Sequence, residues 1–379
     1  MLVIGGCRIV TPGELIEYGW LRVRGEQIAE TGIGAFEGDL DVDLAGHTIV
    51  PGFVDQHCHG GGRNSFITTD PGEAFRAAQL HLAHGTTSIM ASLVTGTFDD
   101  LANQIRTLVP LVDQDVIFGI HLEGPWISGK FHGAHDPALV RPPTRREVGE
   151  LLAIGDGRIA MVTLAPELPG AIAAIKQIVR ADAVAAVGHT DASYDETRRA
   201  IDAGARVGTH VMNAMRAMRH RDPGPVVALL EDPRVTIEAI CDGHHVHPAV
   251  LRLMFAEAGS GRIAMVTDAM AAAGAEDGSY QLGDLRVEVI DGVARIFGTD
   301  TIAGSTLTLD AAVRFMVLVG KVSLQAAIRS VSTTPAEAMG LEDRGSIEVG
   351  KRADLAVLGP DLRVRSVMVR GEWVESFDV

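Results

Sequence analysis

The sequence contains few cysteines, few aromatic residues and no long apolar run. Among its 379 residues are only three cysteines, Cys7, Cys58 and Cys241, which are far apart. A disulfide framework normally places an even number of cysteines close together in a short secreted chain. We therefore expect a cytoplasmic protein without structural disulfides. Since no run of about 18 apolar residues is present, no membrane-spanning segment is expected either.

Positive charge is also scarce. The chain has 33 Lys and Arg residues against 49 Asp and Glu residues, which gives a formal net charge of −16. A strongly acidic protein repels phosphate backbones and anionic lipid surfaces, so the composition argues against binding to nucleic acid or to membranes. An anionic small molecule would have to bind in a local cationic pocket.

Short apolar runs alternate with helical patterns in the middle of the chain. In residues 71–84, for example, Phe75, Ala78 and Leu82 are spaced as the buried stripe of an amphipathic helix. Eight such alternating units predict an α/β fold, a closed (β/α)8 TIM-like barrel, whose active site would lie at the carboxyl ends of the strands. A doubly wound open sheet is the alternative. The eight runs are TIVPGFVDQH, TTSIMASLV, VIFGIHLEG, RIAMVTLAPE, AVAAVGHTD, RVGTHVMNA, VTIEAICDGHH and RIAMVTD.

The two ends of the chain have a different pattern from the middle. Residues 1–50 and 345–379 consist of short β-prone segments separated by glycines. We expect both ends to pair into one small β-sandwich domain. The barrel would then occupy residues 51–344, with a β-hairpin inserted near residues 275–300.

Residues that bind metals follow the predicted barrel strands. His57 and His59 end the first run, and they would point the same way because side chains alternate along a strand. Imidazoles and carboxylates gathered at a barrel mouth suit a divalent ion such as zinc, with iron, manganese or cobalt as alternatives. Four further runs end in residues of these types, namely Glu123, His189, His210 and Asp268.

The predicted metal site has the character of a catalytic site. Structural zinc sites are usually closed by four ligands, often cysteines close in sequence, whereas these ligands are spread over many strands. One or two ions per subunit are conceivable, one held by His57 and His59 and one by Glu123, His189 and His210. A metal-activated water would hydrolyse an amide or related carbon–nitrogen bond. Asp268 would shuttle the proton, or else it would cap a helix.

Eight motifs in this order resemble a known family. They are PGFVDQHCHG (51–60), HLEGPW (121–126), GAHDP (133–137), VGHTDASY (187–194), THVMNAM (209–215), DGHHVHP (242–248), VTDAM (266–270) and IAGSTL (302–307). Over nearly the whole chain they are similar to the N-acetylglucosamine-6-phosphate deacetylases of the amidohydrolase superfamily. The resemblance implies a homodimer that removes acetate from N-acetyl-D-glucosamine 6-phosphate in amino-sugar catabolism and cell-wall recycling, with Asp268 as general base and acid.

The resemblance also implies roles for individual residues. Glu123, His189 and His210 look like the main metal ligands, and His135 resembles a histidine that helps to polarise the substrate carbonyl. The retained pair of histidines at the first motif favours two metals. Arg221 and His245 would bind the phosphate, and in dimeric relatives such an arginine can come from the neighbouring subunit. The substrate contacts implied are Ala134, Asn213, Ala214, Arg221, His245, Ile302, Ala303 and Gly304.

Two other functions are consistent with the same residues. An amidohydrolase acting on a cyclic amide or another N-acyl compound would use the same metal site, and a non-catalytic metal-binding scaffold would keep only the fold. Three arginines gather within residues 216–221 of this acidic chain. Guanidinium groups bind phosphate well, so this segment favours a phosphorylated substrate, although a solvated loop would have the same composition.

Overall fold

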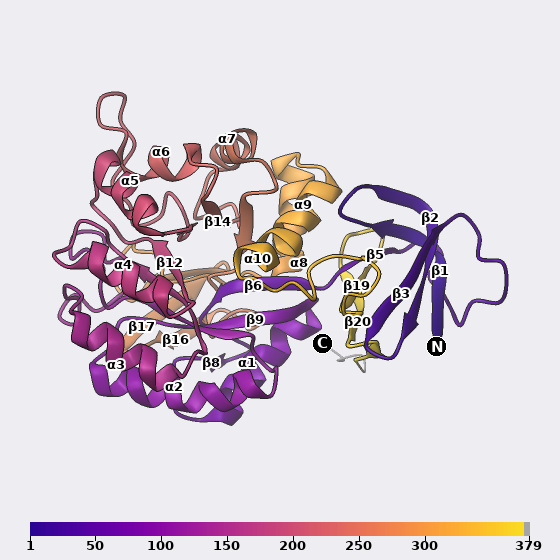
Figure 1. Cartoon of the computed structure of the whole chain (residues 1–379), viewed down its shortest axis with the longest axis horizontal. Coiled ribbons are helices and arrows are strands. Elements are labelled where there is room, and N and C mark those ends of the chain that lie inside the picture. Colours follow the sequence, from indigo (N-terminus) through magenta and orange to yellow (C-terminus); the bar gives the residue numbers. More distant parts are fainter. Residues whose placement is uncertain (375–379) are drawn as a thin grey trace.

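A computed structural model describes residues 1–374, and its largest element is a barrel of parallel strands (Figure 1). The ring closes where the backbone N–H of His59 donates to the carbonyl of Ala269, at 2.7 Å. The predicted barrel is therefore confirmed, and the doubly wound alternative is wrong. In spatial order the strands are β6 (Phe53–Cys58), β9 (Thr86–Leu93), β10 (Gly119–Glu123), β11 (Ile159–Leu164), β12 (Val184–Val187), β13 (Val207–Gly208), β14 (Thr236–Ile240) and β15 (Ile263–Val266).

Helices surround the barrel and begin at polar capping residues. Thr97, Thr144 and Ser193 each accept a hydrogen bond from a backbone N–H in the first turn of their helix, which stabilises these helix starts. The helices are α1 (Pro71–Ala83), α2 (Phe98–Asp113), α3 (Arg145–Gly155), α4 (Ala171–Arg180), α5 (Tyr194–Ala203), α6 (Gly224–Glu231), α7 (Pro248–Ala258), α8 (Leu309–Phe315), the π-helix η1 (Met316–Gly320), α9 (Leu324–Val331) and α10 (Thr333–Ala338). No helix in residues 1–374 is both long enough and apolar enough to cross a membrane.

The buried face of α1 differs from the predicted stripe. Phe75 is 43% exposed, so its assignment to the core is wrong. Ala78 is buried as expected, but its buried neighbours are Ala74, Ala77 and His81. Small alanine side chains allow α1 to lie close to the barrel, and a bulky phenylalanine at the centre of that face would hold the helix away.

The two chain ends form one mixed β-sheet beside the barrel, as Figure 1 shows at the right. The ends meet where β5 pairs with β19 in antiparallel register, with Ile49 opposite Val357. Side chains from both ends, including Ile4, Leu21 and Met368, form a separate hydrophobic core. The strands are β1 (Leu2–Val10), β2 (Leu15–Arg24), β3 (Gln27–Ile33), β4 (Val42–Asp43), β5 (Thr48–Pro51), β19 (Leu355–Leu358), β20 (Val364–Val369) and β21 (Glu372–Trp373).

An ion-pair cluster joins this sheet to the barrel. The carboxylate of Asp115, which follows α2, accepts hydrogen bonds from Arg344 at 3.3 Å, Arg352 at 2.8 Å and Arg370 at 2.6 Å. Arg370 follows β20 in the sheet, whereas Asp115 belongs to the barrel. The cluster therefore fixes the sheet against the amino-terminal end of the barrel strands, away from their carboxyl ends.

An insertion follows the last barrel strand. It consists of β16 (Gly278–Leu282), β17 (Leu285–Ile290) and β18 (Val293–Ile296), which form a three-stranded antiparallel sheet where a hairpin was expected. The third strand arises because Val293 to Ile296 turn back to pair with β17. Leu282 at the end of β16 reaches the mouth of the barrel. Two short strands after β6, β7 (Gly60–Gly61) and β8 (Asn64–Ser65), pair with each other.

Candidate active site

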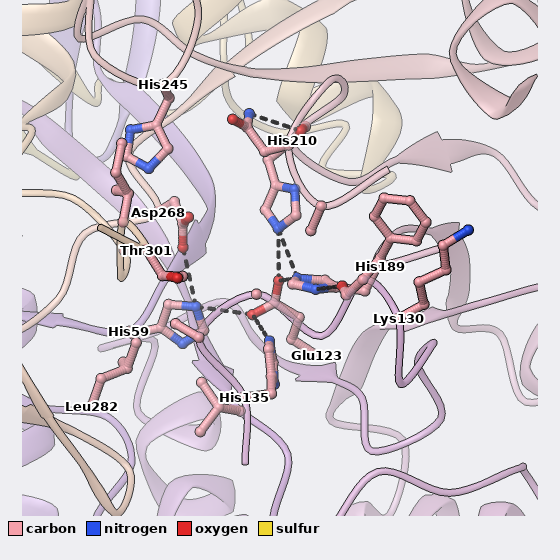
Figure 2. Close-up of a pocket in the computed structure, with 18 residues that line it drawn as sticks. His59, Glu123, Lys130, His135, His189, His210, His245, Asp268, Leu282 and Thr301 are labelled. Carbon is pink, nitrogen blue, oxygen red and sulfur yellow. Dashed lines mark hydrogen bonds and ion pairs between the residues drawn. The ribbon is translucent and has the colours of Figure 1, made fainter. Parts of the chain in front are cut away.

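A pocket of about 370 Å³ opens at the carboxyl ends of the barrel strands. This is at the small end of the range for ligand sites, so it suits a small molecule. The predicted metal-binding and catalytic residues His59, Glu123, His135, His189, His210 and Asp268 line it. Figure 2 shows these six side chains pointing toward a common centre.

Glu123, the last residue of β10, lies between two groups of histidines. Its Oε1 atom is 3.0 Å from Nε2 of His189 and 2.9 Å from Nε2 of His210. Its Oε2 atom faces the other side, 3.2 Å from Nε2 of His59 and 3.5 Å from Nε2 of His57. One carboxylate thus contacts both predicted ligand sets with different oxygens.

The ring nitrogens that face one another are arranged as metal ligands. Nδ1 of His59 donates to the carbonyl of Ser92 at 3.0 Å, and Nδ1 of His189 donates to the carbonyl of Phe131 at 2.9 Å. In the neutral ring, the lone pair of Nε2 then faces inward, as second hydrogen bonds of this kind achieve in metal sites. Two ring nitrogens that face each other in this way repel, unless a proton or a metal ion lies between them.

The separations between these nitrogens fit a small divalent ion. Nε2 of His189 and Nε2 of His210 are 3.1 Å apart, and Nε2 of His57 and Nε2 of His59 are 3.3 Å apart. Ligands placed tetrahedrally about 2.0–2.1 Å from a zinc ion lie about 3.3–3.4 Å from each other. The donor set and its spacing both suit a divalent metal, as does the gathering of His57, His59 and Asp268 within one potential metal-binding group.

The carboxylates in the pocket create a strong preference for positive charge. Burial by itself would lower the pKa of His59, but the carboxylates of Asp268 and Glu123 raise it to about 9. Burial likewise opposes a charged His57, yet Glu123, Glu238 and Asp268 raise its pKa well above the ordinary value. The histidines therefore hold protons where a bound cation would compete with them.

Asp268 is placed for proton transfer. Its Oδ1 atom lies 3.2 Å from Nε2 of His59. The side chain is 11% exposed, and it lines the pocket. Although burial would raise the pKa of Asp268, His57 and His59 lower it below the ordinary value, which keeps the carboxylate ionised. The alternative of a helix cap is wrong, because Asp268 is followed by a β-bridge at Ala269 and a turn at residues 271–274, and not by a helix.

His135 has a different tautomer from the ligand histidines. The backbone N–H of Thr95 donates to its Nδ1 atom at 3.1 Å, so the ring proton must be on Nε2. That nitrogen faces the pocket, 3.5 Å from Oε2 of Glu123. His135 can therefore donate a hydrogen bond to a ligand oxygen.

Most of the predicted substrate contacts lie around the same pocket. His245 lines it, and a hydrogen bond of 2.7 Å between its Nδ1 and Oδ2 of Asp242 fixes the ring. Ala303 is buried directly beside the lining residues of its turn. Arg221 does not line the pocket and is exposed in the loop before α6. The other expected contacts that line the pocket are Ala134, Asn213, Ala214, Ile302 and Gly304.

Three converging residues have left-handed backbone conformations. The φ angles are 47° at His189, 27° at His210 and 49° at Asp268. Residues other than glycine rarely adopt this conformation, and it costs roughly 1–3 kcal/mol at each position. Such strain is typical of functional sites, where a side chain must point in a direction that a regular strand does not allow.

Several residues that support the site were not predicted from the sequence. Glu238 in β14 bonds to His57, Ser92 in β9 bonds to the ring of His59 through its carbonyl, and Thr95 fixes His135. A signal for Glu238 was present, since it is the single charged residue in the apolar run VTIEAIC. No comparable signal marks Ser92 or Thr95, whose contacts depend on the tertiary fold.

Comparisons with known proteins agree on one family. The model of the amidohydrolase family matches residues 48–374. The N-acetylgalactosamine-6-phosphate deacetylase of Escherichia coli O157:H7 is 34% identical over 369 residues, covering 94% of this chain and 96% of that protein. The N-acetylglucosamine-6-phosphate deacetylase of Vibrio furnissii is 33% identical over 350 residues, covering 90% of this chain and 87% of that protein.

Solved structures give the same result. The crystal structure of N-acetyl-D-glucosamine-6-phosphate deacetylase from Mycobacterium smegmatis has a TM-score of 0.96 at 47% identity, covering 99% of this chain and 100% of that chain. A mutant of the enzyme from the same organism, solved in complex with N-acetyl-D-glucosamine-6-phosphate, is 48% identical with a TM-score of 0.96 and covers 98% of both chains.

Proposed function

The chain belongs to the amidohydrolase family, and on that premise we propose the reaction that its pocket performs. The protein hydrolyses the acetamide of N-acetyl-D-glucosamine 6-phosphate and releases D-glucosamine 6-phosphate and acetate. The observation that carries this function is the convergence of Glu123, His189, His210 and Asp268 in one pocket, within a chain 48% identical to an enzyme solved with that substrate.

The side chains of the pocket account for the chemistry. A divalent ion held by Glu123, His189 and His210 would lower the pKa of water and polarise a carbonyl. Asp268, ionised and exposed to the pocket, takes the proton from the water that attacks the acetamide carbon. It then returns the proton to the amide nitrogen as the carbon–nitrogen bond breaks. His135 donates a hydrogen bond from its Nε2–H group to the acetamide oxygen and so stabilises the negative charge that develops there.

We propose zinc as the ion and two ions per subunit. Imidazole nitrogens with carboxylate oxygens at these separations suit zinc, and Glu123 offers one oxygen to each group of histidines. The second ion would be held by His57 and His59, which contact Asp268 on the side away from His189.

The phosphate would be bound at the outer end of the pocket. His245 lies across the pocket from His135 in Figure 2 and is fixed there by Asp242. Arg221 is exposed on its own subunit, so we propose a homodimer in which it reaches the pocket of the neighbouring subunit. All three cysteines are buried free thiols, which suits the proposed cytoplasmic location.

The test is to supply zinc-loaded protein with N-acetyl-D-glucosamine 6-phosphate and with the unphosphorylated sugar and to measure acetate. Fast release from the phosphorylated sugar alone would support both the reaction and the phosphate contacts. Release from neither sugar would refute the proposed function. A second candidate substrate is N-acetyl-D-galactosamine 6-phosphate, because a relative named for it is 34% identical. Comparing kcat/KM for the two phosphorylated sugars decides between them.

A further inference from the structure

Glu238, in the middle of β14, is a fully buried carboxylate with no part in the reaction steps above. A carboxylate inside a barrel is costly unless charged or polar partners compensate for the lost water. Two of its three side-chain hydrogen bonds lead to metal-binding histidines. This placement distinguishes Glu238 from the carboxylates that line the pocket.

Each oxygen of Glu238 has a defined partner. Oε1 accepts a hydrogen bond of 2.8 Å from the side-chain amide of Gln56. Oε2 is 3.0 Å from Nδ1 of His57 and also accepts the backbone N–H of His210 at 3.1 Å. One oxygen therefore contacts a residue from each of the two ligand sets.

We propose that Glu238 is a positioning residue for metal binding, and above all for the ion at His57 and His59. Because Nδ1 of His57 donates to Glu238, the neutral ring that would bind a metal has its lone pair on Nε2, the nitrogen that lies 3.3 Å from Nε2 of His59. A carboxylate behind a ligand histidine fixes the ring and makes it a better ligand. This inference rests on the proposed two-ion site.

The contact with His210 is of a different kind. Glu238 accepts a hydrogen bond from the backbone N–H of His210, which has a strained φ of 27°, but it forms no hydrogen bond with Nδ1 of the ring. Loss of the carboxylate charge would therefore weaken the His57 ligand directly, whereas the ring of His210 would keep its contact with Glu123 at 2.9 Å. The two ions should respond differently to a change at Glu238.

Gln56 allows the charge of Glu238 to be removed without loss of its hydrogen bonds. The Oε1 atom of Gln56 is buried and has no hydrogen-bond partner. In Glu238→Gln, the amide of Gln56 can rotate and accept from the new side-chain amide. The oxygen of that new amide would then still accept from His57 and His210. The substitution thus tests the charge while it keeps the shape.

The experiment is equilibrium dialysis against buffered zinc, with zinc per chain measured by mass spectrometry and acetate release measured in parallel. We expect two zinc ions in the wild type. In Glu238→Gln we expect one tightly held ion and a dissociation constant for the other that is raised about 10–100-fold. Gln56→Met is the matched control, because it removes the hydrogen bond to the other oxygen of Glu238 but keeps the carboxylate behind His57, and it should retain both ions.

Each outcome separates this inference from the proposed function. Two ions of wild-type affinity in Glu238→Gln would refute the role of Glu238, whatever the activity. A wild type that binds one ion would refute both this role and the two-ion site, while acetate release would still test the reaction itself. If Glu238→Gln does not fold, Glu238→Asp keeps the charge but shortens the reach to His57. Unchanged affinity for both ions in that variant would equally overturn the proposal.

Discussion

Removal of the bound metal should make the protein less stable as the pH rises above neutral. In the metal-free protein, the carboxylates of Asp268 and Glu123 overcome the effect of burial and raise the pKa of His59 from 6.5 to about 9. The folded protein then binds this proton more tightly than the unfolded chain does. Its contribution to stability is complete below pH 6.5 and is lost as the pH rises through 9.

The size of the effect follows from the same pKa. A rise from 6.5 to about 9 corresponds to a loss on the order of 3 kcal/mol, because each pKa unit is worth about 1.4 kcal/mol. The pKa of His57 is also raised, so it acts in the same direction. His81, His121 and His189 have lowered pKa values, so they reduce the stability of the protein only as the pH falls below 6.5 and do not mask the change.

The measurement is urea unfolding at several pH values between 6.5 and 9, with chelator-treated and zinc-loaded protein. The free energy of unfolding of the chelated protein should fall across this range. The zinc-loaded protein should not lose stability in this way, because metal binding requires deprotonated ligands and strengthens as the pH rises. His59→Gln should reduce the fall in the chelated protein. A chelated wild type whose stability is constant or rises between pH 6.5 and 9 would refute the reasoning.

Three further predictions concern single side chains. Asp268→Asn should lower kcat for acetate release by about 10²–10⁴ with little change in KM, and unchanged kcat would remove its role. Arg221→Ala should raise KM for the phosphorylated sugar only; an equal rise for the unphosphorylated sugar would contradict phosphate binding. Asp115→Ala should lower the free energy of urea unfolding, because three arginines lose their shared carboxylate. We expect roughly 2 kcal/mol, between the values for exposed and for buried ion pairs, because Asp115 is partly exposed. Since that cluster lies away from the pocket, a changed kcat would show that its effect is not confined to stability.

The barrel could be predicted because its signal is repeated. Eight apolar runs followed by polar residues leave few architectures open, and an error in one run would not change the fold. The face of α1 rested on a single helix pattern, so the choice of Phe75 over Ala74 and Ala77 went uncorrected. The periodicity of apolar residues does not show how close a helix lies to its sheet. In α1 the helix lies so close that only small side chains such as alanine fit at the centre of the buried face.

The residues of the site also divide into those that a repeated sequence pattern predicted and those that it did not. Residues such as Glu123 and His189 could be located because each ends a run, and parallel strands bring such ends together. Glu238 was missed because it lies inside a run, where alternation alone does not decide between the barrel interior and the helices. Arg221 is a case that one chain cannot decide, because it is exposed here and the pocket that we propose it serves would belong to another copy.

The strained residues explain why local sequence rules fail at this site. Glycine would adopt a φ of 47° or 49° without cost, but it lacks the imidazole and the carboxylate that His189 and Asp268 place in the pocket. Tertiary hydrogen bonds therefore hold the strained backbone: the N–H of Asp268 donates to His57 at 2.9 Å, and its carbonyl accepts from Ser305 at 2.7 Å. The N–H of His210 is held by Glu238. The same carboxylate that we infer to orient a metal ligand thus also stabilises a backbone that the ligand set requires, which ties metal binding to the packing of the barrel interior.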